Sequence, residues 1–290
     1  MKFRALVAAI ILAGSTALVA QSFSSSADPR DADAIPGGGS HSEVLSAPAP
    51  SAPVVRPFSK VAFGTGISPL GIQVSMTTNI NSHLNLRTSS NFFSYSTNFT
   101  ESGIGAKASL AMKSAGTALD IYPFHKGFRV SPGLLFYNGN QVSAIASVPG
   151  GTSFTLNDQT YYSANANSTT GATPVNGNAL VNMHTTSPAF TITTGWGNTI
   201  PRKGHWSFPF EVGVALTGAP SMKVNLGGWA CYDKAQTLCT DITSKTDPIA
   251  LEIQDNLNAQ VAKWTNDIQP LNTYPIASFG VAYSFGLRNR

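Results

Sequence analysis

Hydrophobic and polar side chains alternate along three long stretches of the chain. In residues 128–137 the apolar face carries Phe128, Val130, Pro132, Leu134 and Phe136. The opposite face carries Arg129, Ser131, Gly133 and Tyr137. Residues 206–216 and 277–287 repeat the pattern, with large apolar side chains on one face and mostly Ser, Gly and Ala on the other. A period of two predicts β-strands that bury one face in an apolar environment.

The same criterion predicts eight strands in all. They cover residues 58–68, 72–80, 84–95, 104–122, 128–138, 189–198, 206–217 and 274–287. The fourth is irregular, because Leu110 and Met112 have the opposite parity from Leu119 and Ile121. A β-bulge near residues 114–116 would reconcile the two halves.

The connections between these strands alternate in length, which gives a second indication of the fold. Residues 81–83, 123–127 and 199–204 are short turns, whereas 96–103, 141–187 and 218–273 are longer, and only the tight turn at 69–71 departs from this order. Outer-membrane barrels have short turns on the periplasmic side and long loops outside. The last loop contains residues 248–268, which begin with Pro and carry an apolar stripe typical of a helix.

Together these patterns predict an all-β fold, an eight-stranded antiparallel transmembrane up-and-down β-barrel with long extracellular loops, one containing a short helix. Only 11% of the residues are charged, against about 25% in an average soluble domain. A soluble lipocalin-like carrier is the alternative that would turn the apolar face inward. The small and polar opposite faces of residues 206–217 and 274–287 disfavour it, because they could not line an apolar cavity.

The N-terminal part is expected to lie outside the barrel. Residues 1–20 have a basic start, an apolar core and small residues after it, as in a secretory signal peptide, which extends to 27 if cleavage follows Ala27 instead of Ala20. Residues 21–57 are rich in Ser, Ala, Pro, Gly and Asp and are predicted to be a disordered linker. The barrel domain then occupies residues 58–290, with the linker and the C-terminus in the periplasm.

Aromatic side chains near the strand ends are predicted to form two girdles at the membrane–water interfaces, because amphipathic rings prefer the headgroup level. The predicted interface aromatics are Phe92, Phe128, Phe136, Trp196, Trp206, Tyr274, Tyr283 and Phe285.

Charged residues on the inward parity are the main candidates for chemistry. They are Arg87, Asp120, Arg129 and Glu211, with Lys107 or Lys113 from the irregular strand. An eight-stranded barrel is just filled by its own side chains, so a structural ion-pair network is expected, with a gated pore as the functional alternative. Asp120 with Glu211 is the carboxylate pair available for acid–base catalysis, but the arginines are equally near. We therefore expect no catalytic residue and no enzymatic activity.

Other sites are expected to be structural. Cys231 and Cys239 are predicted to form a disulfide, in preference to free thiols, because a close pair in an exported protein closes a small loop. A metal site would need more ligands than cluster there, and His83, His125 and His205 are expected in separate turns. We therefore expect no metal site and no cofactor.

Four segments resemble a known family. They are DIYPFHKGFRVSPGLLFYNGN, VPGGTSFTLNDQTYYS, GWGNTIPR followed by FPFEVGVALTGAP, and the closing YPIASFGVAYSF. Over residues 58–285 the chain resembles OmpA-like outer-membrane β-barrel proteins of an acidobacterial type. This resemblance implies an outer-membrane location and eight strands, and it implies no activity.

The expected role is structural or concerned with surface interaction in the bacterial cell outer membrane. The expected partners are outer-membrane lipid, lipopolysaccharide and the outer-membrane assembly machinery, with an external ligand that the sequence does not name. A small porin-like channel for small solutes is the first alternative. The net charge of +4 is modest and no basic cluster interleaves with aromatics, so no nucleic-acid binding is expected.

Overall fold

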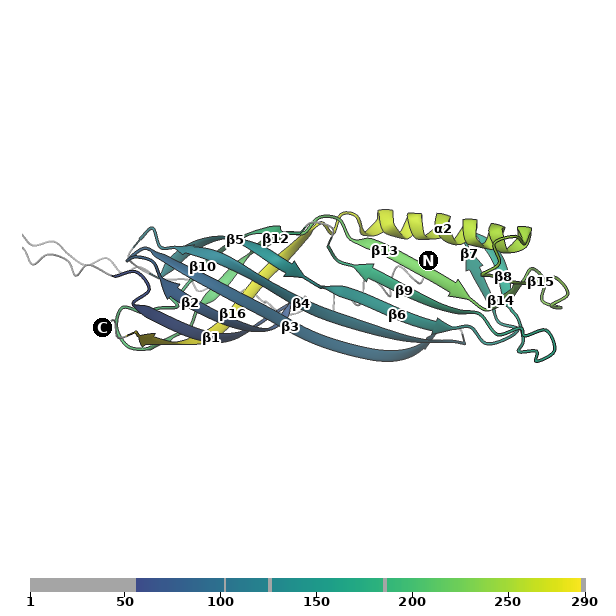
Figure 1. Ribbon diagram of the computed structural model, residues 1–290, viewed down its shortest axis with the longest axis horizontal. Helices are drawn as coiled ribbons and strands as arrows, with labels where there is room; N and C mark the ends of the chain where they lie inside the picture. Colours follow the sequence, from purple (N-terminus) through teal and green to yellow (C-terminus); the bar gives the residue numbers. More distant parts are fainter. Residues whose placement is uncertain (1–55, 102, 125–126, 185–186, 288–290) are drawn as a thin grey trace, which may run out of the picture. The chain divides into compact units, whose positions relative to one another are not determined.

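The chain is mostly antiparallel β-sheet with one helix in the part that the computed structural model describes, residues 56–287 apart from 102, 125–126 and 185–186 (Figure 1). The predicted signal peptide and nearly all of the predicted linker lie outside these residues. Within the described part, no helix combines the length and the apolarity that crossing a membrane requires.

Twelve strands form a large sheet. They are β1 (Lys60–Ser68), β2 (Gly71–Asn79), β3 (Leu84–Glu101), β4 (Ile104–Ile121), β5 (Phe128–Asn138), β6 (Gln141–Ser147), β9 (Asn176–Asn182), β10 (Ala189–Trp196), β11 (Trp206–Ser207), β12 (Phe210–Leu216), β13 (Ser221–Gly227) and β16 (Thr273–Gly286). From β1 the pairing runs through β2 and β3 to β4, and in the other direction through β16, β12 and β10 to β5. β5 pairs with β10 along one edge and with β4 along the other, and all these pairs are antiparallel.

The β3–β4 hairpin is the longest element, with 18 residues in each strand and an unbroken register. Its first part lies between β2 and β5, and its distal part pairs instead with β6, which continues into β9 and β13. We call this distal part, together with β6, β9 and β13, the extension. In Figure 1 the extension continues away from β1, β2 and β16 toward the helix.

Polarity reverses along this sheet. We call the face that carries Arg87 and Asp120 the inner face, and the opposite one the outer face. Away from the extension, the outer face exposes large apolar side chains, including Ile72, Val74, Met76, Leu86, Phe92, Ile192, Val212 and Phe279. On the same face the extension carries mostly polar residues, with the exposed Ile145 as an exception. The polar residues include Ser94, Ser96, Asn98, Lys107, Lys113, Asn178, Lys223 and Asn225. Along β3, the outer face changes from apolar to polar directly after Phe92, so this one strand meets two different environments.

A second sheet and the helix form a separate layer beyond the extension. The sheet has the order β15 (Cys239–Asp241), β14 (Trp229–Cys231), β8 (Gln159–Ser163) and β7 (Ser153–Leu156). Helix α2 (Pro248–Ile268) packs on β13, β7 and β15. These elements share one apolar core, which contains Val148, Leu156, Tyr161, Val175, Ala230, Ile242, Ile253 and Leu257. We call the second sheet and α2 the distal module.

Local chemistry explains where α2 begins. The side chain of Asp247 accepts a hydrogen bond from the backbone N–H of Ile249, as an N-cap residue does. Pro248 follows at the first helical position, where its missing N–H costs nothing. Thr240 donates from β15 to the same carboxylate, at 2.6 Å between oxygens. These bonds lower the pKa of Asp247 and tie the start of the helix to the second sheet.

Several predicted boundaries differ from the structure. Residues 248–268 form a helix as predicted, although at 21 residues it is not short. The predicted loops 141–187 and 218–273 contain seven strands, and the predicted loop 96–103 is mostly strand. The strand predicted at 206–217 is interrupted at Pro209, because proline cannot donate to a ladder.

The bulge is confirmed, but it does not have the predicted effect. The register between β4 and β5 shifts at Ala115/Gly116, where Phe136 of β5 is the additional residue. β4 keeps its register with β3, so Leu110 and Met112 remain on the inner face. There Met112 packs with Leu135, Met183 and Tyr274 in a small apolar cluster.

The burial of Ile253 on α2 allows a test of the distal module. Replacing Ile253, which is fully buried in its core, with Ala is expected to destabilise the module by about 2–5 kcal/mol, because it leaves a cavity. Hydrogen exchange of amides in α2 and β14 measures this loss. Leu251→Ala on the exposed side of the same helix is the matched control, with an expected change below about 0.5 kcal/mol. Equal protection in both variants would contradict the packing described.

Candidate functional site

Four charged side chains from four strands meet on the inner face of the large sheet. Arg87 comes from β3, Asp120 from β4, Arg129 from β5 and Glu211 from β12. Each occupies the inward parity of its strand, so the alternation that exposes large apolar groups on the outer face directs these residues inward. These are the same four residues that the sequence suggests as a network.

Both arginines bridge the carboxylates. The Arg87 guanidinium donates to Asp120, at 3.1 Å between Nη2 and Oδ1, and to Glu211, at 2.7 Å between Nη2 and Oε2. Arg129 donates to the same Glu211 oxygen from 3.1 Å, and its other terminal nitrogen donates to the carbonyl of Gly197 at 2.7 Å. Its Nε lies 4.0 Å from Asp120. The result is a closed group of two cations and two anions.

The burial of this group dictates its composition. Asp120 is fully buried, and 2% of Arg129 and 3% of Glu211 are exposed. A buried charge is costly unless opposite charges and hydrogen bonds compensate it. Ser131 supplies one such bond to Asp120 at 2.7 Å, and the hydroxyl of Thr193 lies 3.4 Å from Glu211. The four formal charges cancel, and we call these residues the ion cluster.

Two small cavities lie against the ion cluster. Arg87 and Glu211 line both of them. One has a volume of about 50 Å³ and reaches the turn after β1 at Ser68 and Leu70. The other has a volume of about 20 Å³ and reaches Thr199. Such volumes hold a few water molecules, so the cluster separates two water-sized spaces and leaves no room there for a solute.

The remaining polar candidates do not join the cluster. Lys107 and Lys113 are exposed on the outer face, because β4 does not change parity. Asp120 and Glu211 both bind Arg87, so neither carboxylate is placed as a free acid or base. The pattern of alternation did not single out Ser131, Thr193 or the Gly197 carbonyl as ligands of the charges. The sequence offered one sign for Ser131 and Thr193, because both lie on the inward parity of their strands and could therefore reach the charges.

Most of the aromatic residues predicted at the interfaces lie on the surface. Phe92, Phe136, Trp196, Trp206 and Phe285 are exposed, whereas Phe128 and Tyr283 are half-buried in ring contacts with Trp196 and Trp206. The prediction for Tyr274 is wrong. Only 8% of it is exposed, and its hydroxyl donates to the carbonyl of Met183. Tyr274 pairs with the buried Ala215, so the parity of β16 turns it inward.

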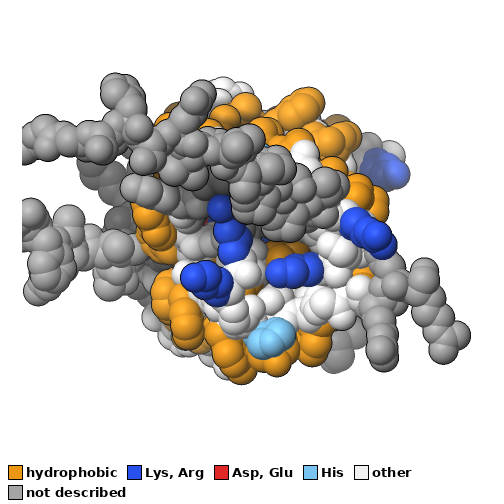
Figure 2. Space-filling view, turned by 90° about the vertical axis from the view of Figure 1, so that its left-hand side faces the viewer, with side chains coloured by type: hydrophobic (Ala, Val, Ile, Leu, Met, Phe, Trp, Pro, Cys, Tyr) orange, Lys and Arg blue, Asp and Glu red, His pale blue; other side chains and the backbone are white. Residues whose placement is uncertain are grey.

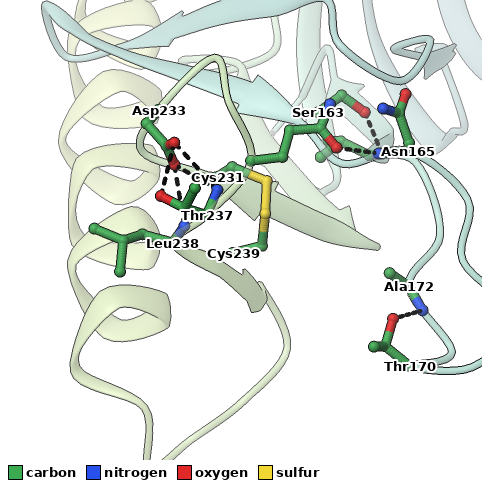
Figure 3. Close-up of a disulfide and its surroundings, with 11 residues drawn as sticks. Ser163, Asn165, Thr170, Ala172, Cys231, Asp233, Thr237, Leu238 and Cys239 are labelled. Carbon is green, nitrogen blue, oxygen red and sulfur yellow. Dashed lines mark hydrogen bonds between the residues drawn. A yellow bond between two sulfur atoms is a disulfide. The ribbon is translucent and has the colours of Figure 1, made fainter.

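The disulfide between Cys231 and Cys239 is confirmed (Figure 3). The two residues face each other across β14 and β15, with their Cα atoms 4.0 Å apart. Beside it, the Asp233 carboxylate accepts hydrogen bonds from the backbone N–H groups of Thr237 and Leu238. These bonds lower the pKa of Asp233. They and the disulfide fix the loop between the two strands at the edge of the distal module.

Histidine and acidic groups do not assemble into a metal site in the described part of the chain. His205 stacks on Tyr283, with ring centroids 5.3 Å apart, and its Nδ1 lies 2.8 Å from the carbonyl of Ser284. His83 lies in the turn after β2 with its Nδ1 2.9 Å from the hydroxyl of Ser82. His125 and His41, which the sequence places in a turn and in the linker, fall outside the described residues.

Removing one charge from the ion cluster tests its role. Glu211→Gln is expected to cost about 3–5 kcal/mol of unfolding free energy, because two buried arginines then share one carboxylate. Urea unfolding, followed by gel migration with and without boiling, measures the loss. Adding Arg129→Gln restores neutrality and is expected to recover part of it. Thr193→Val, which touches the same carboxylate, is the control and is expected to cost about 1 kcal/mol; a loss as large as that of Glu211→Gln would argue against a charge effect.

No protein-family model matches the chain, and no curated protein matches it. Among solved structures, CarO of Acinetobacter baumannii is similar, with 18% identity, a TM-score of 0.46, and coverage of 79% of this chain and 98% of that chain. CarO2 of the same organism has 17% identity and a TM-score of 0.47, and covers 80% and 100%. At this level of similarity, the function has to be inferred from the residues of this chain itself.

Proposed function

We propose that the chain is an outer-membrane β-barrel protein that anchors the distal module at the cell surface. Eight strands, β1 to β5 with β10, β12 and β16, each pair with two of the others, and this supports a closed eight-stranded antiparallel barrel. A closed barrel satisfies every strand edge, which the interior of a bilayer requires. The resemblance to OmpA-like barrels belongs to this proposal.

The reversal of outer-face polarity after Phe92 is the observation that carries the proposal. Away from the extension, outer-face side chains such as Val74, Ile192 and Phe279 are about half exposed, and the ion cluster lies on the inner face of the same strands. On the extension, the same face carries mostly Ser, Asn and Lys, with Ile145 as an exposed apolar exception. A soluble carrier would show the opposite order, apolar inside and polar outside, along its whole length. An apolar band around a polar interior suits a protein surrounded by lipid.

The positions of the chain ends suggest the orientation. Residues 56–59 and Leu287 lie at the end of the barrel with the short turns, where the N–H of Leu287 donates to the carbonyl of Ser59. Short turns face the periplasm in such barrels. The extension and the distal module would then stand outside the cell, in contact with lipopolysaccharide and with an external ligand. The assembly machinery of the outer membrane would insert the barrel.

The ion cluster favours an anchor over a small porin-like channel. Its four side chains lie inside the ring of strands, and the cavities beside it have volumes of about 50 and 20 Å³. A conducting pore would need a continuous water-filled path past charged groups that already bind one another. Since both carboxylates bind Arg87, we also propose that the protein has no enzymatic activity.

Conductance measurements separate an anchor from a channel. Purified protein in a planar bilayer is expected to give no steady unitary current, because the ion cluster fills the interior. Glu211→Gln, which weakens the cluster, serves as the comparison. It is expected to increase the current noise without producing unitary steps. Reproducible unitary current steps from the unmodified protein would contradict the anchor function and support the porin-like channel.

The facing of β12 gives a second test. Val212, with 39% of its surface exposed, lies in the middle of the apolar band. Val212→Arg is expected to cost about 2–4 kcal/mol in lipid, because it places a charge near the bilayer midplane. Asn178→Arg, on the outer face of the extension, is the matched control and is expected to be nearly neutral. Similar costs for both, from urea unfolding in vesicles, would place the two positions in the same environment and remove the basis of the proposal.

A further inference from the structure

The turns at one end of the barrel are held together by backbone hydrogen bonds. We call the segments that they join, residues 56–60, 79–84, 122–124, 127–128, 197–206 and 283–287, the turn end. The bonds run from Phe58 N–H to Asn79 O, from Tyr122 N–H to His83 O, from Gly197 N–H to Gly127 O, from Ser284 N–H to His205 O and from Leu287 N–H to Ser59 O, at 2.7–2.9 Å. Side chains from separate turns therefore share one surface.

Charge is strongly one-sided on this surface. Arg56, Lys60, Arg202 and Lys203 belong to the turn end, and its described segments contain no Asp or Glu. Every carboxylate with a described side chain outside the ion cluster lies within residues 158–267, in the distal module and the loops that lead to it. Figure 2 shows Lys and Arg side chains gathered on this end.

Within the part of the chain that the structure describes, these four basic side chains have no acidic partner. Among the described residues, the ion pairs outside the cluster are confined to Lys263 with Asp158. Arg56, Arg202 and Lys203 are exposed, and Lys60 is half-buried. The carboxylates of the ion cluster, Asp120 and Glu211, already bind two arginines. Over its described segments, the turn end therefore carries a net positive charge.

Exposed aromatic side chains border the same surface. Trp206, with 62% of its surface exposed, lies three residues after Lys203 and packs edge-on against Tyr283, with centroids 4.8 Å apart. Tyr283 contacts Phe285 at the same distance. In Figure 2 hydrophobic side chains form a rim around the basic ones. Tryptophan and tyrosine favour the headgroup level of a bilayer, so these cations stand where lipid phosphates lie.

We propose that the turn end binds the phosphate groups of anionic phospholipids in the membrane leaflet on its side. This inference rests on the proposed membrane location and adds the lipid class and the leaflet. Lys and Arg extend their apolar stems along hydrophobic surface and hold the charge at the headgroups. Each such cation attracts an anionic membrane surface, and salt weakens this attraction.

The arrangement of the cations favours a lipid surface over a soluble anion. Arg56 and Lys60 precede and begin β1, whereas Arg202 and Lys203 lie in the turn between β10 and β11. They come from two separate segments of the chain, and three of the four are exposed. A single phosphate ion bound from solution needs several donors aimed at one point. Separate exposed cations match a layer of separate headgroups.

Tryptophan quenching by brominated lipid measures this preference. The protein is reconstituted into vesicles of phosphatidylcholine and phosphatidylglycerol, with bromine on one lipid class at a time. Trp196 and Trp206 lie beside the turn end and report on lipids there. We expect stronger quenching by the phosphatidylglycerol, and a preference that falls as salt is added.

Two double variants test which cations are responsible. Arg202→Gln with Lys203→Gln is expected to lower the preference by roughly fivefold per cation lost. Lys107→Gln with Lys223→Gln removes the same charge from exposed positions on the extension and is expected to leave the preference unchanged.

Three outcomes would overturn the inference. One is equal quenching by both lipids in a protein that folds in the vesicles and shows heat-modifiable migration. Another is an equal loss of preference in both double variants, which would reveal a response to net charge alone. The third is displacement of the lipid by inorganic phosphate, against sodium chloride of matched ionic strength, which would identify a soluble-anion site. If the protein failed to enter vesicles at all, that result would contradict the proposed membrane location itself. It is therefore distinguishable from the three outcomes above, which contradict lipid binding by a protein in the membrane.

Discussion

The constraint on which the rest of the structure depends is the change of environment along a single hairpin. β3 and β4 keep one register over 18 residues each, so their two faces never exchange places. The surroundings must therefore change instead. Up to Phe92 the outer face is apolar and the inner face holds polar groups; beyond it the outer face is polar and the inner face carries Phe93, Tyr95 and Met112. At the proposed membrane location, the first part would meet lipid and the second would meet water.

The ion cluster follows from the same constraint. Where the outer face is apolar, the inner face carries polar and small residues. Four strands each contribute one charged residue to this inner face. Such a group is weak evidence for stability, because desolvation offsets much of the Coulomb attraction. Its clearest consequence is geometric. Arg87 joins Asp120 of β4 to Glu211 of β12, strands that do not pair with each other, so the cluster links opposite parts of the sheet.

Charge also divides the chain along its length. Among the described residues, exposed cations lie on the turn end and on the extension, the four charges of the ion cluster lie inside, and the exposed carboxylates lie in the distal module and its loops. The module itself is held by different forces from those of the strands. It has an apolar core under α2, a disulfide across β14 and β15, and an N-cap tied to β15. The eight strands of the proposed barrel instead expose large apolar side chains on their outer face.

The sequence by itself determined the features that depend on neighbours along the chain. Alternation located β1, β2, β10 and β16 and the inward parity of Arg87, Asp120, Arg129 and Glu211, and the spacing of apolar residues located α2 with both its ends. Only the tertiary structure decided what depends on distant segments. Residues 141–147 and 176–182 are strands that the sequence pattern assigns to polar loops. Their partners lie elsewhere in the chain: residues 141–147 pair with the distal part of β4, and residues 176–182 pair with β6 and β13. Its place at a strand end predicts Tyr274 as an interface aromatic, but its pairing with Ala215 directs its side chain to the inner face. Alternation assigns a side chain to one of two faces, but which face meets lipid, water or another layer is set by the strands that pack around it.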